Sequence, residues 1–181
     1  MLRSHQGAVH RLLRVFLLAV LVSASIAAPA AAAGLVHEFK AGVLAHYVGG
    51  LFSGSQVERD AADINLEAIF SPSLPFLWGT IRPATGATIN TRDARWEIEA
   101  PSGIFLALGL GAAVHDGHLE PDAADRKALG SRVLFHVPLE LGYRFDAHNS
   151  LSLYYEHMSN ANTAEFNEGM DFLGVRYGYR F

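Results

Sequence analysis

Apolar and polar residues alternate with a period of two along most of the chain beyond residue 35. Successive side chains of a β-strand point to opposite faces, so this period predicts strands with one apolar and one polar face. In the segment 131–145 the polar face holds His136, Glu140, Gly142 and Arg144. The apolar face of the same segment consists of Phe135, Val137, Leu139, Leu141, Tyr143 and Phe145.

Eight segments carry this pattern, and the number is even, as in the smallest barrels of bacterial outer membranes. Most are close to the roughly 9–11 residues that a tilted membrane strand needs. Short links alternate with the longer polar links 50–60 and 117–130, as periplasmic turns alternate with external loops. We therefore expect an all-β, eight-stranded antiparallel transmembrane barrel of the outer membrane, with strands at 36–49, 61–70, 78–90, 93–100, 103–116, 131–145, 149–160 and 169–181.

The polar face of these strands is rich in glycine and in charged residues, which fit a narrow barrel lumen better than a water-exposed surface. This places the apolar face outward, toward lipid. A soluble lipocalin-like barrel, with the apolar face in its lumen, is the alternative. The lumen of the membrane barrel would hold ion pairs among the charged residues Glu67, Glu140, Arg144, Arg176 and Arg180.

The N-terminus has the features of an export signal. Its first part is basic and contains no acid, an apolar stretch follows, and small residues offer a cleavage site after Ala33. We expect a signal peptide at 1–33 and a single barrel domain at 34–181. An uncleaved membrane anchor is the alternative, although the apolar run is short for a spanning helix.

Composition excludes several classes of function. The 181 residues carry a net charge of −4, which gives no basic surface for nucleic acid. The chain has no cysteine, so disulfides and thiolate metal sites are impossible. His115 and His118 are three residues apart, which places them on opposite faces of a strand, so a solvated loop is favoured over a metal site. We expect no metal and no cofactor.

Polar residues interrupt the apolar face of the last two strands. Continuing the outward set of 149–160 by twos reaches His157 and Ser159, and the outward set of the final strand extends back to Asp171. If the turn between these strands centres near residue 164, Asp171 lies opposite His157. A carboxylate on the lipid face costs up to a few kcal/mol. The three residues are therefore either in water at the rim or form a hydrolytic triad, with Ser159 as nucleophile, His157 as base and Asp171 as orienting acid.

Two further residues bear on this site. The hairpin that joins 131–145 to 149–160 puts Phe135 beside Ser159 on the same face. There it either supports an acyl chain or the triad by apolar contact, or it is an ordinary lipid-facing residue. Arg126 and Lys127 lie in an external loop. We expect both to be solvated, with contact to the phosphates of an outer-leaflet lipid as the alternative.

Several motifs resemble the outer-membrane lipid A 3-O-deacylase (PagL) family along most of the chain. They are "YYEHMSNA", "NEGMDFLGVRYGYRF", "IRPATGATINT", "GLGAAVHDG" and "SRVLFHVPLELGYRF". The His-x-Ser-Asn signature of the family is matched by His157, Ser159 and Asn160, and the resemblance implies that Asn160 helps to stabilise the oxyanion. The acidic position holds Asp171 where the family pattern has Glu, a side chain one methylene longer.

The resemblance implies a serine esterase that removes the 3-hydroxyacyl chain from position 3 of lipid A in the outer leaflet. Lipid A, or lipopolysaccharide, would be the substrate, and outer-membrane lipids would surround the protein. A homodimer is also compatible with the resemblance. The alternative function is that of a small barrel without enzymatic activity, acting as a structural or binding protein.

Overall fold

The computed structural model describes residues 32–46, 62–87, 90–122 and 126–181. The predicted signal peptide lies outside the described residues except for its last two positions. Within the described ranges, no helix is both long and apolar enough to cross a membrane.

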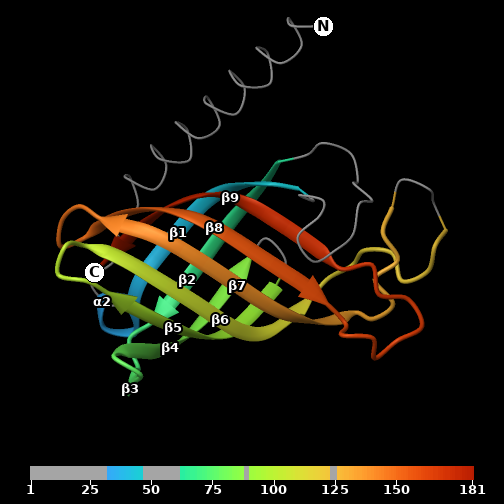
Figure 1. The fold of residues 1–181 in the computed structure, drawn as a ribbon, viewed down its shortest axis with the longest axis horizontal. Helices are drawn as coiled ribbons and strands as arrows, with labels where there is room; N and C mark the ends of the chain where they lie inside the picture. Colours follow the sequence, from blue (N-terminus) through green and yellow to red (C-terminus); the bar gives the residue numbers. More distant parts are fainter. Residues whose placement is uncertain (1–31, 47–61, 88–89, 123–125) are drawn as a thin grey trace, which may run out of the picture.

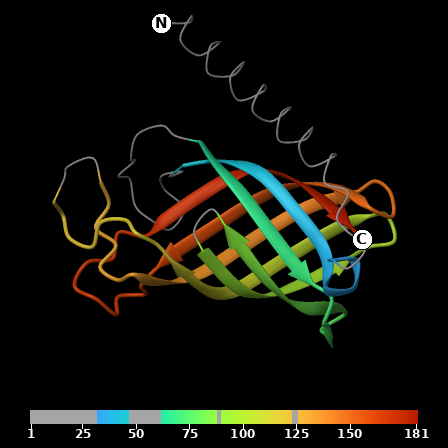
Figure 2. The same cartoon turned by 180° about the vertical axis from the view of Figure 1, so that it is seen from behind.

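The chain forms one antiparallel sheet that closes on itself (Figures 1 and 2). Each strand pairs with the next one along the chain, except that β2 pairs with β4 instead of with the short β3. The pairing of β1 with β9 closes the barrel. A short helix, α2 (Ala32–Leu35), precedes the sheet. The strands are β1 (Val36–Ala45), β2 (Ala62–Phe70), β3 (Leu74–Phe76), β4 (Gly79–Ala87), β5 (Asn90–Glu99), β6 (Ile104–Val114), β7 (Val133–Arg144), β8 (Asn149–Ser159) and β9 (Met170–Arg180).

Each of the eight predicted segments corresponds to one long strand, so the predicted eight-stranded barrel is confirmed. The strand predicted at 93–100 begins three residues earlier, at Asn90, and the predicted positions 47–49, 61 and 88–89 lie outside the described residues. The three-residue strand β3 was not predicted. The C-terminus lies at one end of the barrel, and the loop residues 115–122, 126–132 and 160–169 lie together at the other end (Figure 1). This second end is the external end in the predicted orientation.

Residues alternate strictly between the two sides of β7, where every second residue is buried. His136 and Glu140 are each 1% exposed in the lumen, whereas Leu139 and Leu141 on the outer side are 43% and 54% exposed. Leucines on β6 and β8 are exposed in the same way. The apolar face is therefore the exterior, as in a barrel whose wall is surrounded by lipid, and the lipocalin-like alternative is wrong.

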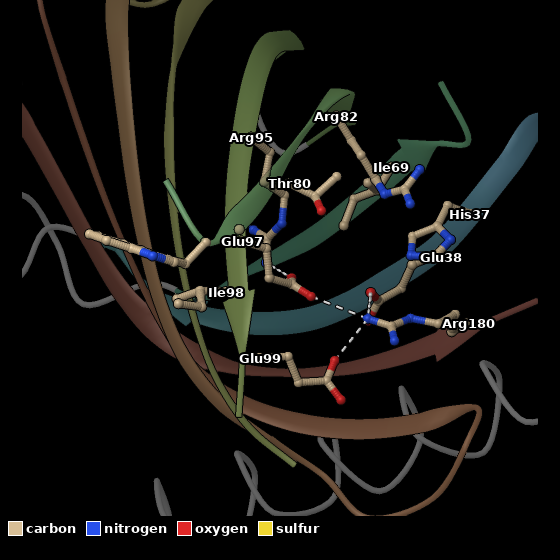
Figure 3. Close-up of a pocket in the computed structure, with 12 residues that line it drawn as sticks. His37, Glu38, Ile69, Thr80, Arg82, Arg95, Glu97, Ile98, Glu99 and Arg180 are labelled. Atoms are coloured by element: carbon tan, nitrogen blue, oxygen red, sulfur yellow. Dashed lines mark hydrogen bonds and ion pairs between the residues drawn. The ribbon is translucent and has the colours of Figure 1, made fainter. Parts of the chain in front are cut away.

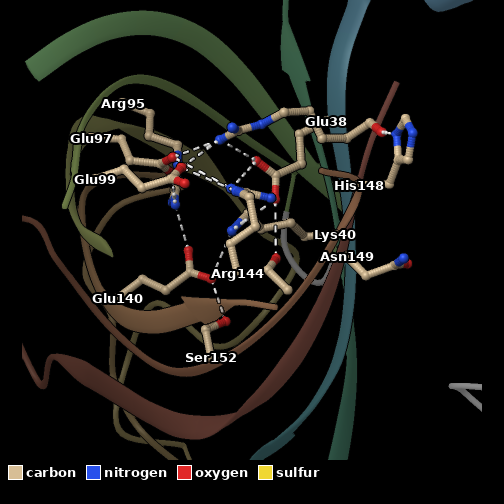
Figure 4. A network of polar contacts seen from close by, with 12 residues as sticks. Glu38, Lys40, Arg95, Glu97, Glu99, Glu140, Arg144, His148, Asn149 and Ser152 are labelled. Carbon is tan, nitrogen blue, oxygen red and sulfur yellow. Dashed lines mark hydrogen bonds and ion pairs between the residues drawn. The ribbon is translucent and has the colours of Figure 1, made fainter. Parts of the chain in front are cut away.

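A buried network of charged groups fills much of the lumen (Figure 4). Glu140 is its centre. Its carboxylate lies 3.0 Å from Lys40 Nζ and 2.6 Å from Arg95 Nη2, and it also pairs with Arg176 and accepts a hydrogen bond from Ser152. The predicted ion pairs of the lumen are thus confirmed, and sequence reasoning missed the participation of Lys40 and Arg95. Because each buried charge faces an opposite one, the polar lumen can be tolerated.

A small hairpin protrudes from the wall near the end that holds the C-terminus (Figures 1 and 2). Leu77 and Trp78 form its tip, and both have a positive φ, of 42° and 60°. Two-residue turns of this kind normally contain Asn or Gly. Trp78 is 91% exposed, and the indole of Trp96 on β5 donates to the Phe76 carbonyl at 2.9 Å. The hairpin thus presents an apolar tip next to the lipid-facing wall.

Candidate functional site

The predicted site residues meet on the exterior, where β7, β8 and β9 lie side by side. In the β8–β9 hairpin His157 is directly opposite Asp171, and in the β7–β8 hairpin Phe135 is directly opposite Ser159. Directly opposed residues of antiparallel strands have neighbouring side chains on the same face. The structure therefore brings these four residues together as predicted.

Ser159, His157 and Asp171 form a continuous chain of hydrogen bonds. His157 Nδ1 lies 2.6 Å from Asp171 Oδ1, and His157 Nε2 lies 3.1 Å from Ser159 Oγ. An ionised carboxylate can only accept, so Nδ1 of the neutral imidazole carries the hydrogen. Nε2 is then the acceptor for the hydroxyl of Ser159. This is the arrangement in which an imidazole can act as a general base toward a serine.

Asp171 is completely buried although it belongs to the outward face. Its Oδ1 accepts a second hydrogen bond from the hydroxyl of Tyr155, at 2.7 Å. Tyr155 was missed by sequence reasoning, although its place two residues before His157 on the same face could have revealed it. The shorter side chain of Asp reaches His157 because the two residues are directly paired, so no extra methylene is needed.

The outer part of the site remains accessible from the lipid side. The side chain of His157 is 19% exposed and Ser159 is half-buried, whereas Phe135 beside them is 51% exposed. The acid is thus covered, whereas His157 and Ser159 are both partly exposed. The interpretation in which all three polar residues sit in rim water is wrong for Asp171, which has no exposed surface.

The side chain of Asn160 does not face the nucleophile in this structure. It is 1% exposed and lies on the opposite side of the strand from Ser159. Its amide nitrogen donates to the carbonyl of Leu129 at 2.9 Å and to that of Phe166 at 2.5 Å. Both amide hydrogens are therefore committed to loop carbonyls, and the expected side-chain oxyanion donor is not available in this conformation. Asn160 instead ties two external loops together.

Lys127 also differs from its prediction. Instead of being solvated, it is 2% exposed, and its Nζ donates to the carbonyl of Gly169 at 2.7 Å. Both predicted environments, open water and contact with lipid A phosphates, require an exposed ammonium group. The prediction for Lys127 is therefore wrong.

The two histidines considered as metal ligands have separate partners. His115 Nε2 lies 2.7 Å from the Ser131 carbonyl, and His118 Nδ1 lies 2.7 Å from Asp122. No group of three or more His, Cys, Asp or Glu residues suited to a metal occurs in the part of the chain that the structure describes.

A cavity of about 320 Å³ lies at the other end of the barrel (Figure 3). Charged side chains line much of it, and Arg180 pairs there with Glu97 and Glu99 at 3.2 Å each. None of the triad residues lines this cavity. The candidate site is therefore a surface on the barrel wall rather than a pocket in the lumen.

Comparison with known proteins identifies the family. Residues 63–180 match the family model described as lipid A 3-O-deacylase (PagL). Lipid A deacylase PagL of Bordetella bronchiseptica (strain ATCC BAA-588 / NCTC 13252 / RB50) is 32% identical over 77 residues, which cover 42% of this chain and 41% of that protein. The match thus spans less than half the length of this relative. The crystal structure of the outer membrane enzyme PagL has a similar fold, with a TM-score of 0.57, 18% identity, and coverage of 80% of this chain and 99% of that chain. The chain belongs to the lipid A 3-O-deacylase (PagL) family.

Proposed function

We propose that this protein is an outer-membrane lipid A 3-O-deacylase, a serine esterase that hydrolyses the 3-hydroxyacyl ester at position 3 of lipid A. The observation that carries the proposal is the hydrogen-bonded row of Ser159, His157 and Asp171 on the lipid-facing wall. Family membership supports the substrate class, because the matching relative is named a lipid A deacylase. The apolar exterior of the barrel supports the membrane location.

In the first half of the reaction, Ser159 Oγ attacks the ester carbonyl carbon while His157 Nε2 accepts the hydroxyl proton. The imidazolium that forms is stabilised by the carboxylate of Asp171, which keeps its charge. His157 then returns the proton to the sugar oxygen as the bond between this oxygen and the acyl carbon breaks. The products of this step are a free hydroxyl on lipid A and an acyl ester of Ser159.

In the second half, a water molecule takes the place of the alcohol. His157 Nε2 accepts its proton while the water oxygen attacks the acyl carbon of the ester on Ser159. Return of the proton to Ser159 Oγ releases the 3-hydroxy fatty acid and restores the enzyme. The proposed cycle uses no cofactor, because the nucleophile, the base and the charge that stabilises the base all come from the chain.

The location of the site suits a substrate that stays in the membrane. Ser159 ends β8 at the external end of the barrel, so an ester near the headgroup of an outer-leaflet lipid can approach it sideways. Phe135 is paired with Ser159 across the β7–β8 hairpin, and its side chain is 51% exposed. It therefore offers an apolar surface beside the nucleophile. We assign it the contact with the acyl chain that is to be removed.

The test is mass spectrometry of lipid A from cells that express the wild type, Ser159→Ala or His157→Ala. The wild type should produce lipid A that lacks one 3-hydroxyacyl chain, and each variant should leave lipid A unmodified. Heat-modifiable gel mobility shows whether each variant is a folded barrel. Unmodified lipid A with a folded wild-type protein would instead favour the non-enzymatic barrel. Wild-type deacylation by a folded Ser159→Ala would show that the nucleophile is another group.

A further inference from the structure

Three consecutive residues of an external loop, Lys127–Leu129, are buried at the external end of the barrel, although Lys127 was expected to be solvated. Lys127, Ala128 and Leu129 are 2%, 1% and 4% exposed. Leu129 belongs to the cluster of buried apolar residues at this end of the lumen. A buried lysine is unusual in any protein and has to be explained by what its ammonium group contacts.

The segment is bonded to the loop that follows β8. Ala128 N donates to Glu168 Oε2 at 2.6 Å, and Glu168 N donates to the Ala128 carbonyl at 3.1 Å. Next to this reciprocal pair, Lys127 Nζ donates to the Gly169 carbonyl at 2.7 Å. These bonds hold residues 168 and 169 against residues 127 and 128. We call this arrangement the loop clasp.

The clasp reaches the candidate site through Gly169, which lies against the imidazole. A Cβ atom added to Gly169 would lie 2.9 Å from His157 Cε1 and 3.4 Å from Ser159 Cβ. The first distance is shorter than a real Cβ atom can accept, so Gly169 faces the edge of the ring between its two nitrogens and leaves no room there for a side chain. Asp171 and Ser159 are hydrogen-bonded to the two nitrogens of His157, and Gly169 faces the carbon Cε1 that lies between these nitrogens.

The ammonium group of Lys127 is needed for position rather than for packing. A buried apolar side chain would fill the same space without the desolvation cost of a charge. A donor, unlike an apolar side chain, can bond to the carbonyl of Gly169, and hydrogen bonds from charged groups are the stronger kind. This bond ties Lys127 to the residue whose backbone faces His157.

We propose that Lys127 is a positioning residue of the esterase: through its bond to the Gly169 carbonyl it holds the His157 imidazole in line with Ser159. The inference rests on the proposed function. Losing the bond lets Gly169 and the imidazole shift, and a displacement of about 1 Å at a reacting group costs on the order of 100-fold in rate. Substrate binding is left unchanged, because Lys127 is too buried to contact lipid A.

The test compares Lys127→Met with Arg126→Met, which removes the neighbouring charge from an exposed position. Two rates are measured on purified, folded protein in detergent: release of 3-hydroxy fatty acid from lipid A, and covalent labelling of Ser159 by a fluorophosphonate. Lys127→Met should lower kcat by about 10–100-fold with KM unchanged, and should slow labelling to a similar extent. Arg126→Met should change neither rate, and Lys127→Arg, which can still donate to the carbonyl, should restore part of both.

The proposal is overturned if Lys127→Met keeps the wild-type kcat, or if it raises KM together with Arg126→Met, since the second result indicates binding of lipid A phosphates. If Lys127→Met does not fold, Lys127→Gln is used, because its shorter side chain loses the bond but stays polar; an unchanged kcat there also overturns the proposal. Ser159→Ala distinguishes failure of the proposed function from failure of the role proposed for Lys127. Full activity of Ser159→Ala refutes the proposed nucleophile, whatever the result for Lys127→Met.

Discussion

Asp171→Asn is the substitution that best separates the charge of the acid from its geometry. Asn has nearly the same shape as Asp, and both observed hydrogen bonds, from His157 Nδ1 and from the hydroxyl of Tyr155, go to the same oxygen, Oδ1. An amide oxygen can accept both of them. The substitution therefore keeps an acceptor for Nδ1–H, so the imidazole keeps its tautomer, while the negative charge is lost and Oδ2 is replaced by an amide NH2.

The size of the effect follows from Coulomb's law. Two unit charges about 4 Å apart attract by about 4 kcal/mol at an effective dielectric constant of 20. This attraction stabilises the imidazolium of His157 in the transition state, and each 1.36 kcal/mol corresponds to about a tenfold change in rate. The His157 side chain is 19% exposed, so solvation offsets part of the loss. We expect kcat to fall by roughly 100- to 1000-fold.

The assay is the rate of 3-hydroxy fatty acid release from lipid A in detergent, with gel mobility before and after heating as the control for folding. Asp171→Asn should remain measurably more active than Ser159→Ala, which loses the nucleophile. A folded Asp171→Asn within about twofold of the wild type would refute the electrostatic argument. A rate as low as that of Ser159→Ala would refute the claim that the amide preserves the tautomer.

Three further predictions follow from other contacts. Tyr155→Phe removes the second donor to Asp171 and should lower kcat by about threefold to tenfold without changing KM. A hydrogen bond to a charged group contributes about 1.5–3 kcal/mol, and only part of this energy differs between the ground state and the transition state. Glu140→Gln leaves buried cations of the lumen facing a neutral amide, so the free energy of unfolding, measured by urea denaturation in detergent, should fall by about 3–5 kcal/mol. A loss below about 1 kcal/mol would show that the ion pairs of Glu140 do not stabilise the barrel. Trp78, studied alone in a Trp96→Phe background, should be quenched by brominated phospholipids in vesicles, whereas quenching by aqueous iodide alone would show that the hairpin tip lies in water.

The barrel and the triad could be predicted from sequence for the same reason. A strand has a period of two, and the position of a tight hairpin fixes which residues face each other. Once the turn was placed near residue 164, the pairing of His157 with Asp171 followed, and the structure has this register. Phe135 opposite Ser159 followed in the same way from the preceding hairpin.

The loops and the small hairpin could not be predicted on these grounds, because neither has a period. Burial of Lys127 depends on how one external loop folds back on another, which no local pattern records. The alternation along β8 places Asn160 on the inner side, as observed, but it does not indicate that the amide bonds to carbonyls of two loops. The turn at Leu77 and Trp78 has positive φ values without the residues that normally signal them.

The proposed catalysis takes place on the outer wall of a barrel, where charged groups are costly. A carboxylate facing lipid costs up to a few kcal/mol, yet the proposed base needs a negative charge beside it. Asp171 is covered by its neighbours and accepts hydrogen bonds from both Tyr155 and His157, so its charge is shielded from hydrocarbon while it remains in contact with the imidazole. The polarity of the site thus reaches the lipid side only through His157 and the hydroxyl of Ser159, which carries no charge. A substrate ester that arrives sideways meets the nucleophile first, and the charge that activates it stays behind the imidazole.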